Sequence, residues 1–263
     1  MWILFWQLVC VRAVLFLWVV GRKYTNPSVP RRDYVVKNLA KACTLALLTP
    51  VAVASARGVL VAGRWHAPTF RVFGAVYASH DIAGLLRMWD KLPNSTRAHH
   101  LSVVLMSTLS AVTIDYENPQ SLWRGVGMLG CVSCWTFPVN VYVALRLVGN
   151  YDTLRKFCMC VYAPTVMLSF LWQLRHVCSV GLCWSTPLYV TLVGLVIYDD
   201  LVLLRFLRKN APSTPGPDCQ TLHRLWDGMP PPGDAPKADD APVAPAEHRR
   251  TFEFAAVYAG DVE

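Results

Sequence analysis

Charged residues are scarce in this sequence. Only 16% of its 263 residues are Asp, Glu, Lys or Arg, and 54% are hydrophobic, whereas soluble domains carry about 25% charged residues. This deficit points away from an ordinary soluble domain and toward a membrane protein. The net charge is +8, but the basic residues recur in short clusters between apolar runs. Because no aromatic-basic module accompanies them, we expect no nucleic acid partner.

A complete cysteine metal site is also missing. Most of the nine cysteines lie in apolar runs, where a thiol packs as a small hydrophobe. Cys131 and Cys134 have the spacing of half a metal site, but no second half follows. No small-residue cleavage site follows segment 2–20, so this segment reads as an uncleaved first membrane helix. We expect no metal and no cofactor, although bound phospholipids such as cardiolipin are compatible with such a chain.

What the sequence does contain is a series of long apolar runs. A helix needs about 20 apolar residues to cross a bilayer, and seven segments approach that length. They predict an all-α polytopic membrane protein with about seven transmembrane helices. The fourth is short and the fifth, which contains Pro138, is long, so tilt or a kink is expected. The predicted helices are 2–20, 38–62, 70–89, 99–115, 122–148, 155–177 and 184–207.

The positions of Lys and Arg predict how these helices are oriented. Fourteen lie in or near alternate connections on one side, against four on the other. Basic residues gather on the cytosolic or matrix side of a membrane, so we expect the N-terminus outside and the C-terminus on the positive side. The fourteen are Arg22, Lys23, Arg31, Arg32, Lys37, Arg87, Lys91, Arg97, Arg146, Arg155, Lys156, Arg205, Arg208 and Lys209.

The chain changes character after Asn210. Three parts are predicted: an N-terminal helix with a basic loop (1–37), a transmembrane bundle (38–210) and a Pro/Ala-rich extended tail (211–263). Half of the 18 prolines lie within 211–246, and such a segment cannot bury a core. Alone in water the tail is expected to be disordered, so a partner assembly is the simplest means of holding it.

Several ionisable residues fall inside the predicted helices, where they are costly and usually face the bundle interior. Arg12 lies near the middle of the first helix and needs a partner. An acidic group such as Asp81 or Asp199, a lipid phosphate or another subunit would serve. The remaining buried charges are Lys41, Asp81, Asp199 and Asp200.

Two histidine pairs mark the hairpin formed by the third and fourth helices. The stretch YASHDIAGLLRMWDKLPNSTRAHH (77–100) places His80 beside Asp81, and His99 beside His100. Adjacent residues point about 100° apart on a helix, so His80 and Asp81 do not face each other. An acid–base pair must reach a substrate and zinc needs three or four converging ligands. The types of residue are right for either, but spacing alone does not bring them together.

This pattern resembles the TLC domain family, which includes ceramide synthases and other lipid-handling membrane proteins. The resemblance rests on the tyrosine, the His-Asp pair, the short loop and the His-His pair, and it covers about residues 35–210. The segment SCWTFPVN (133–140) approximates a motif of non-synthase members, Glu-x-Ser-Thr-Pro-Phe-x-Asn, through Thr136, Phe137, Pro138 and Asn140. The resemblance implies a seven-helix bundle and makes Asp81, His99 and His100 the candidate catalytic residues.

The chain also departs from that family. Ceramide synthases carry a His-Asp-x-x-Asp motif about thirty residues after the His-His pair. The corresponding segment here, LGCVSCWTFPVN, has no His, Asp or Glu, and the glutamate of the other members would fall near Ser133. Asp199 and Asp200 could replace the lost acids, but the sequence gives no geometric reason for it.

The lost acidic set favours a non-catalytic accessory subunit of a large membrane complex. It would contact other subunits through its N-terminal helix and tail, with a mitochondrial respiratory complex or ATP synthase in the inner membrane as the favoured setting. An endoplasmic reticulum membrane is the alternative. The alternative functions are a lipid-binding or transport protein and an acyl-CoA-dependent N-acyltransferase. The residues expected to contact lipid are His80, Asp81, Arg97, His99 and His100.

Overall fold

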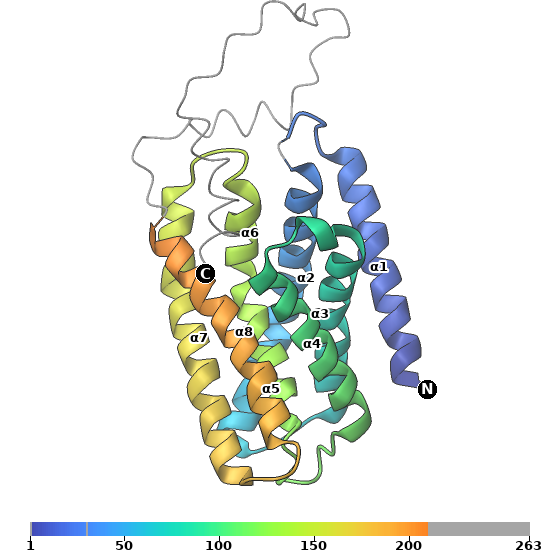
Figure 1. Cartoon of the computed structure of the whole chain (residues 1–263), viewed down its shortest axis with the longest axis vertical. Helices are drawn as coiled ribbons and strands as arrows, with labels where there is room; N and C mark the ends of the chain where they lie inside the picture. The colour runs from blue at the N-terminus through green and yellow to red at the C-terminus, as the bar shows by residue number, and fades with distance from the viewer. Residues whose placement is uncertain (1, 30, 210–263) are drawn as a thin grey trace, which may run out of the picture.

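The computed structural model describes residues 2–29 and 31–209 of the chain (Figure 1). Helices make up 84% of the structure, and no strand occurs among the described residues. The predicted all-α class is therefore confirmed. The tail (211–263), whose extended form and partner contacts were predicted, lies outside the described residues.

Eight α-helices and two short 3₁₀ turns follow one another along the described part of the chain. The first hairpin comprises α1 (Trp2–Tyr24) and α2 (Arg32–Ala62). Next come α3 (Ala67–Met88), the turn η1 (Trp89–Lys91) and α4 (Asn94–Thr113). The remaining elements are α5 (Arg124–Ser133), the turn η2 (Cys134–Thr136), α6 (Phe137–Leu145), α7 (Asp152–Val180) and α8 (Thr186–Lys209).

Six of the helices form a closed ring. Going around it, α2 packs against α3, α3 against α4, α4 against α8, α8 against α7, α7 against α6, and α6 against α2. Helix α5 contacts α2, α3, α4 and α7 and so fills the centre of the ring, while α1 packs outside it on α2 and α3 (Figure 1). The polar side chain of Gln7 ties α1 to α3, because its Nε2 donates to Ala75 O and Ser79 Oγ at 3.0 and 2.8 Å.

Four helical segments are long and apolar enough to cross a membrane: Phe5–Tyr24, Arg32–Ala62, Arg124–Leu145 and Asp152–Val180. This supports the predicted membrane protein, although it does not reach the predicted seven spans. Of the other three long helices, α3 and α4 carry buried acidic and histidine residues, and α8 carries the partly buried Asp199 and Asp200. Many large apolar side chains are exposed on the outside of the bundle, as a lipid-facing surface requires; Phe16, Leu47 and Val61 are examples.

The expected kink of the fifth segment occurs at η2, between α5 and α6. Pro138 has no N–H, so it cannot donate to the carbonyl of Cys134 one turn earlier. That carbonyl instead accepts from Phe137 N–H in a tighter 3₁₀ turn, and Thr49 Oγ1 of α2 lies 3.1 Å from it. A neighbouring helix thus supplies the polar contact that the proline removes, as membrane helices require.

Helix α2 begins six residues earlier than the sequence predicted, at Arg32 instead of residue 38. The predicted boundary between a basic loop and the bundle therefore falls inside a helix. The correction matters most for Lys37, which the topology count placed in the loop and which is in fact buried in α2. The other end of α2 is fixed by Gly63, whose positive φ of 61° ends the helix with its N–H on the carbonyls of Gly58 and Val59.

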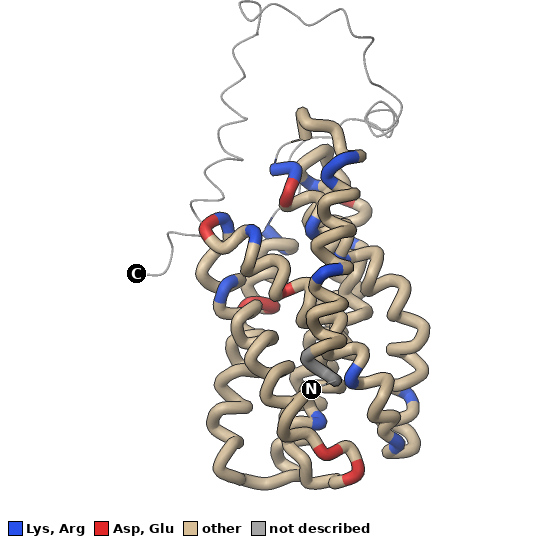
Figure 2. Tube along the Cα trace, turned by 90° about the vertical axis from the view of Figure 1, so that its right-hand side faces the viewer, with Lys and Arg blue, Asp and Glu red and all other residues tan. Residues whose placement is uncertain are grey.

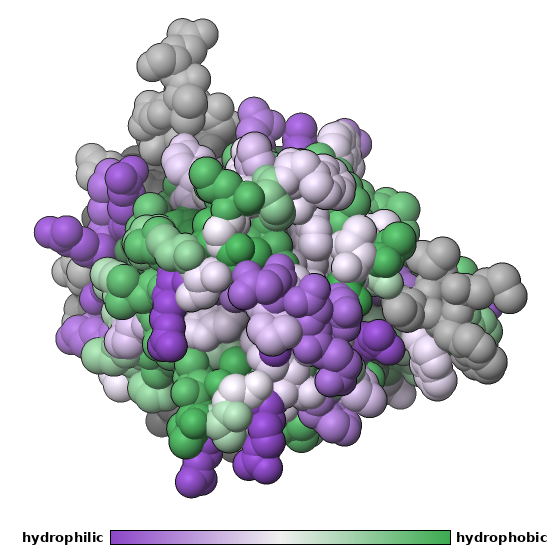
Figure 3. Space-filling model, turned by 90° about the horizontal axis from the view of Figure 1, so that it is seen from below, coloured by the Kyte–Doolittle hydropathy of each residue, from purple (hydrophilic) through white to green (hydrophobic). Residues whose placement is uncertain are grey.

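The two ends of the bundle differ in charge. Lys and Arg gather at the upper end, near the loops that join α1 to α2 and α6 to α7, and few lie at the lower end (Figure 2). Viewed from that lower end, hydrophilic side chains form a patch near the centre and recur at the margins, with apolar side chains between them (Figure 3). A protein with an apolar circumference and two polar ends is suited to a bilayer.

Candidate functional site

A buried carboxylate stands at the centre of the polar residues. Asp81 of α3 has no exposed surface. One of its oxygens, Oδ1, lies 2.9 Å from Lys41 Nζ of α2 and 2.8 Å from His100 Nδ1 of α4. Three helices thus contribute one residue each to a contact around a single oxygen. Because an unpaired buried charge is very costly, the ammonium of Lys41 is what permits the carboxylate here.

His100 continues the chain of contacts on its other side. Its second ring nitrogen, Nε2, lies 3.1 Å from Lys37 Nζ, one turn before Lys41 on α2. Asp81, His100 and Lys37 therefore form a line in which the imidazole has a carboxylate at one nitrogen and an amine at the other. With a carboxylate at Nδ1, the ring is best stabilised with its proton there and its lone pair on Nε2.

His99 has a carboxylate partner of its own. Its Nδ1 lies 3.4 Å from Asp199 Oδ2 of α8, and the Thr96 hydroxyl lies 3.4 Å from the other oxygen of Asp199. The next residue, Asp200, accepts a 2.6 Å hydrogen bond from Tyr162 OH of α7. The adjacent histidines therefore face different helices: His100 faces α3 and α2, and His99 faces α8.

The cluster lies close to the basic end of the bundle. Lys37 is five residues into α2, His100 six into α4, and Asp81 seven before the end of α3. At a rise of 1.5 Å per residue, each is roughly 10 Å below the end of its helix. In helices that cross a bilayer from this end, this would be about the depth at which lipid head groups give way to acyl chains.

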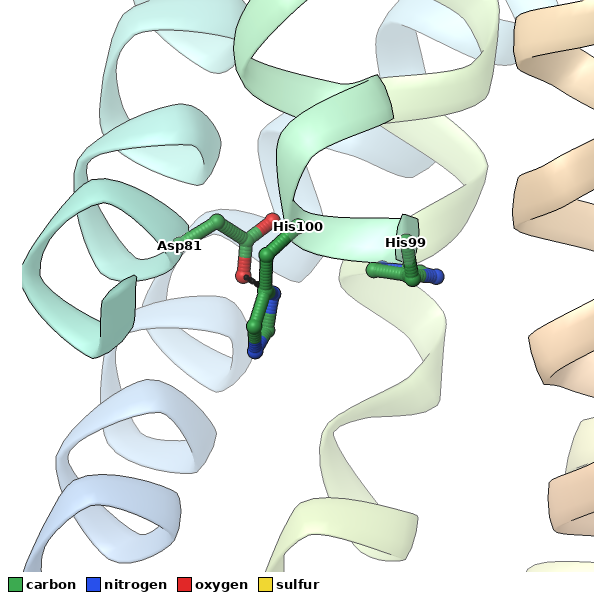
Figure 4. A group of neighbouring side chains, drawn as sticks. All are labelled: Asp81, His99 and His100. Carbon is green, nitrogen blue, oxygen red and sulfur yellow. Dashed lines mark ion pairs between the residues drawn. The ribbon is translucent and has the colours of Figure 1, made fainter. Parts of the chain in front are cut away.

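Asp81, His99 and His100 are neighbours, with Asp81 against His100 and the His99 ring to one side of them (Figure 4). One ligand atom from each can be chosen so that all three are within 4.8 Å of one another. Two histidines and a carboxylate are a known ligand set for iron. Two lysines weigh against a cation here, because Lys41 already pairs with Asp81 Oδ1 and Lys37 lies beside His100.

Burial is uneven across the cluster. The side chains of Asp81 and His100 are 0% and 5% exposed, whereas those of His99 and Asp199 are 9% and 16% exposed. Asp81 Oδ2 is buried and has no hydrogen-bond partner among the described residues. The more exposed part of the cluster is therefore the contact between α4 and α8. In the buried part, Asp81 Oδ2 can still accept a hydrogen bond.

Other residues expected at the site lie elsewhere. His80 is buried, but its Nε2 has no hydrogen-bond partner in the described part of the chain, and it is not one of the three convergent residues. Arg97 stacks its guanidinium 5.4 Å from the centroid of the Trp89 ring. Arg12 is exposed on α1 and forms no ion pair with a described residue, so its expected pairing with Asp81 or Asp199 is not found.

Sequence reasoning missed Lys37 and Tyr162, and it named Asp199 as a replacement for the lost acids without placing it beside His99. Lys37 had been assigned to a loop, and only its spacing of four residues from Lys41 could have placed both on one helix face. Asp199 is nearly one hundred residues from His99, so nothing local could connect them. The cysteines Cys131 and Cys134, considered as half a metal site, lie in the apolar core with their thiols near the carbonyls of Ala52 and Gly130.

Comparison of the chain with protein-family models, with curated proteins and with solved structures found no match. The resemblance to the TLC domain family therefore stays a prediction from the sequence.

We predict that replacing Asp81 by Asn destabilises the fold strongly. The change removes the negative charge and leaves Lys41 buried without a counter-ion. Removing one partner of a buried pair costs about 3–5 kcal/mol. Thermal unfolding of the purified protein in mild detergent measures the effect.

The matched control is the double variant Asp81→Asn with Lys41→Met. It removes both charges, so it is expected to regain much of the stability that Asp81→Asn alone loses. A double variant no more stable than Asp81→Asn would show that Lys41 does not neutralise this carboxylate.

Proposed function

We propose that this chain is a lipid-binding integral membrane protein with seven transmembrane helices and a TLC-like bundle. The ring of six helices with α1 outside it supports the bundle, and α3, α4 and α8 would be the three further spans. Their polar residues face one another inside the ring, so these helices would present apolar surfaces to the lipid despite their charges.

The single observation that carries the proposal is the pair of His–Asp contacts at head-group depth. His99 with Asp199 and His100 with Asp81 place two imidazoles and two carboxylates roughly 10 Å below the basic end. A polar lipid group entering between α4 and α8 would meet His99 and Asp199 first. Such a group needs donors and acceptors that an apolar wall does not supply.

The contact between His99 and Asp199 also bears on chemistry. The segment SCWTFPVN has no acidic residue, and this absence favoured a protein without activity. In the structure α8 supplies a carboxylate to His99 from a different place in the sequence. A histidine oriented by a carboxylate is the usual arrangement of a general base, so acyl transfer to or from the bound lipid is the reaction class that this site would serve.

We expect a lipid to co-purify with the protein and to be lost when the outer pair is removed. His99→Ala with Asp199→Ala takes away both polar groups at the entrance while leaving Asp81 paired with Lys41. Native mass spectrometry from mild detergent measures the fraction of protein with lipid bound.

His66→Ala is the control, because His66 is an exposed histidine outside the cluster, hydrogen-bonded to Thr69. It should leave lipid occupancy unchanged. Equal occupancy in the His99/Asp199 variant and the parent would rule out this site as the lipid contact.

A second function, assembly into a larger membrane complex, is favoured by Arg12. This arginine is exposed on the outer face of α1, about 10 Å from Phe5 and about 18 Å from Tyr24 along the helix. An arginine this deep in a bilayer requires an acidic partner or a lipid phosphate. Because α1 itself packs on the outside of the ring, the surface around Arg12 is where another subunit would bind. The tail, the other expected contact, lies outside the described residues.

Substituting Arg12 with Gln is expected to release the protein from any such complex. Its migration on a native gel of detergent-solubilised membranes would then shift to that of a free chain. Arg57→Gln is the matched control, since Arg57 is also an exposed arginine but belongs to α2 and not to α1. Identical migration of parent and Arg12 variant would exclude assembly through α1.

We further propose that the N-terminus lies outside and residue 209 on the positive side, in the mitochondrial inner membrane or, as the alternative, in the endoplasmic reticulum. This orientation places the loop between α7 and α8 outside. Cys183 lies in this loop, and the hydroxyls of Ser185 and Thr186 near its Sγ lower the pKa of the thiol.

An impermeant maleimide should therefore reach Cys183 from the outside and Cys219 only from the positive side. Peptide mass spectrometry of labelled sealed vesicles shows which of the two cysteines has reacted. Labelling of Cys183 from the positive side would show that the orientation is the opposite of the one proposed. Because a lowered pKa makes thiolate available at lower pH, labelling of Cys183 should begin at a lower pH than in Ser185→Ala, which loses one of the stabilising hydroxyls.

A further inference from the structure

Lys37 is placed as a nucleophilic amine. Its Nζ lies 3.1 Å from His100 Nε2, and His100 Nδ1 lies 2.8 Å from Asp81 Oδ1. The order carboxylate, imidazole, nucleophile is the one by which hydrolases activate a serine or cysteine. Here the third member is an amine, whose proton His100 Nε2 is positioned to accept.

The local packing keeps the amine against the imidazole. Gly84 of α3 faces both groups: a Cβ at this position would lie 3.1 Å from Lys37 Cε and Nζ and 3.7 Å from His100 Nε2. A side chain here would therefore crowd the end of Lys37. The absence of one leaves room for the amine in the space between α2, α3 and α4.

The two lysines of α2 have different partners. Lys41 pairs with Asp81 at 2.9 Å, which accounts for the charge of that carboxylate. Lys37 is one turn away and faces an imidazole instead of a carboxylate. Two ammonium groups so close together repel each other in a buried setting, and this repulsion favours transfer of the Lys37 proton to a neighbouring base.

We propose that Lys37 forms a reversible imine with a long-chain aldehyde. The Lys37 nitrogen attacks the carbonyl carbon, the new C–N bond forms, and the carbonyl oxygen takes up the proton that His100 holds. The nitrogen of the resulting carbinolamine gives a second proton to His100, which passes it to the hydroxyl, so that the hydroxyl leaves as water; the iminium then gives its last N–H proton to His100, leaving a C=N bond. One aldehyde and one amine thus give one imine and one water, with no oxidant or reductant required.

That the aldehyde has a long chain rests on the proposed function, because such a chain must be bound among the helices. The reactivity of the amine does not rest on it, since a short aldehyde needs no lipid site. Propanal therefore tests Lys37 alone, and hexadecanal tests Lys37 together with lipid binding.

The experiment treats the full-length protein in mild detergent with limiting aldehyde and cyanoborohydride, which reduces an imine to a stable amine. Peptide mass spectrometry then locates the label. We expect it on Lys37 in preference to Lys41 and to the exposed Lys91, with complete loss in Lys37→Arg. Label spread over the exposed lysines with none on Lys37 would overturn the proposal.

Two further variants test the role of His100. His100→Gln and His100→Asn both keep a polar side chain at this position but cannot take the proton. Both should lose the label on Lys37, whereas His66→Gln, which lies outside the cluster, should keep it. Should His100→Gln fail to fold, His100→Asn decides. Undiminished labelling in either folded variant would show that Lys37 does not depend on His100. Reaction with propanal but not hexadecanal would leave the amine chemistry in place and refute the lipid site.

Discussion

The arrangement of the bundle depends on the neutralisation of one buried carboxylate. Asp81 has no exposed surface, and a bare carboxylate in such a place would be prohibitively costly. Lys41 and His100 both contact the same oxygen, so α2 and α4 can pack on α3 only in the register that brings them there. Helices packed only by apolar side chains can shift along one another at little cost. The contact of Lys41 and His100 with Asp81 is lost by such a shift, so it favours one packing among several that hydrophobicity alone would allow.

The adjacency of His99 and His100 extends that constraint across the bundle. Consecutive residues on a helix point about 100° apart, so once His100 faces Asp81, His99 must face elsewhere. It meets Asp199 on α8, and Asp200 in turn binds Tyr162 on α7. One dipeptide thus connects α3 with α8, and the polar contacts follow the ring through α2, α3, α4, α8 and α7. The residues that connect the helices are therefore the same residues that are available for chemistry.

Hydropathy predicted the helices well and their partners poorly. The all-α class follows from local properties of the chain and is confirmed, and four helices are long and apolar enough to cross a membrane. The pairing of His99 with Asp199 joins residues about a hundred positions apart, so no local pattern predicts it. Lys37 was predicted to lie in a loop because the basic residues before it conceal where α2 begins. Of the partners considered for Arg12, Asp81 and Asp199 are excluded for a different reason: helical position gives the depth of a residue but not the face, and the face of Arg12 is outward.

The two lysines of the cluster both lie near the basic end of the bundle but have different partners. A positive end attracts anionic head groups, while the charge of Lys41 is already matched by Asp81. Among the described residues, Lys37 pairs with no carboxylate, and its Nζ lies 3.1 Å from His100 Nε2. A lysine in solvent stays an ammonium and is a poor nucleophile. The packing of Gly84, His100 and Asp81 around Lys37 removes solvent and provides a base, which are the two changes that turn an ammonium into a reactive amine.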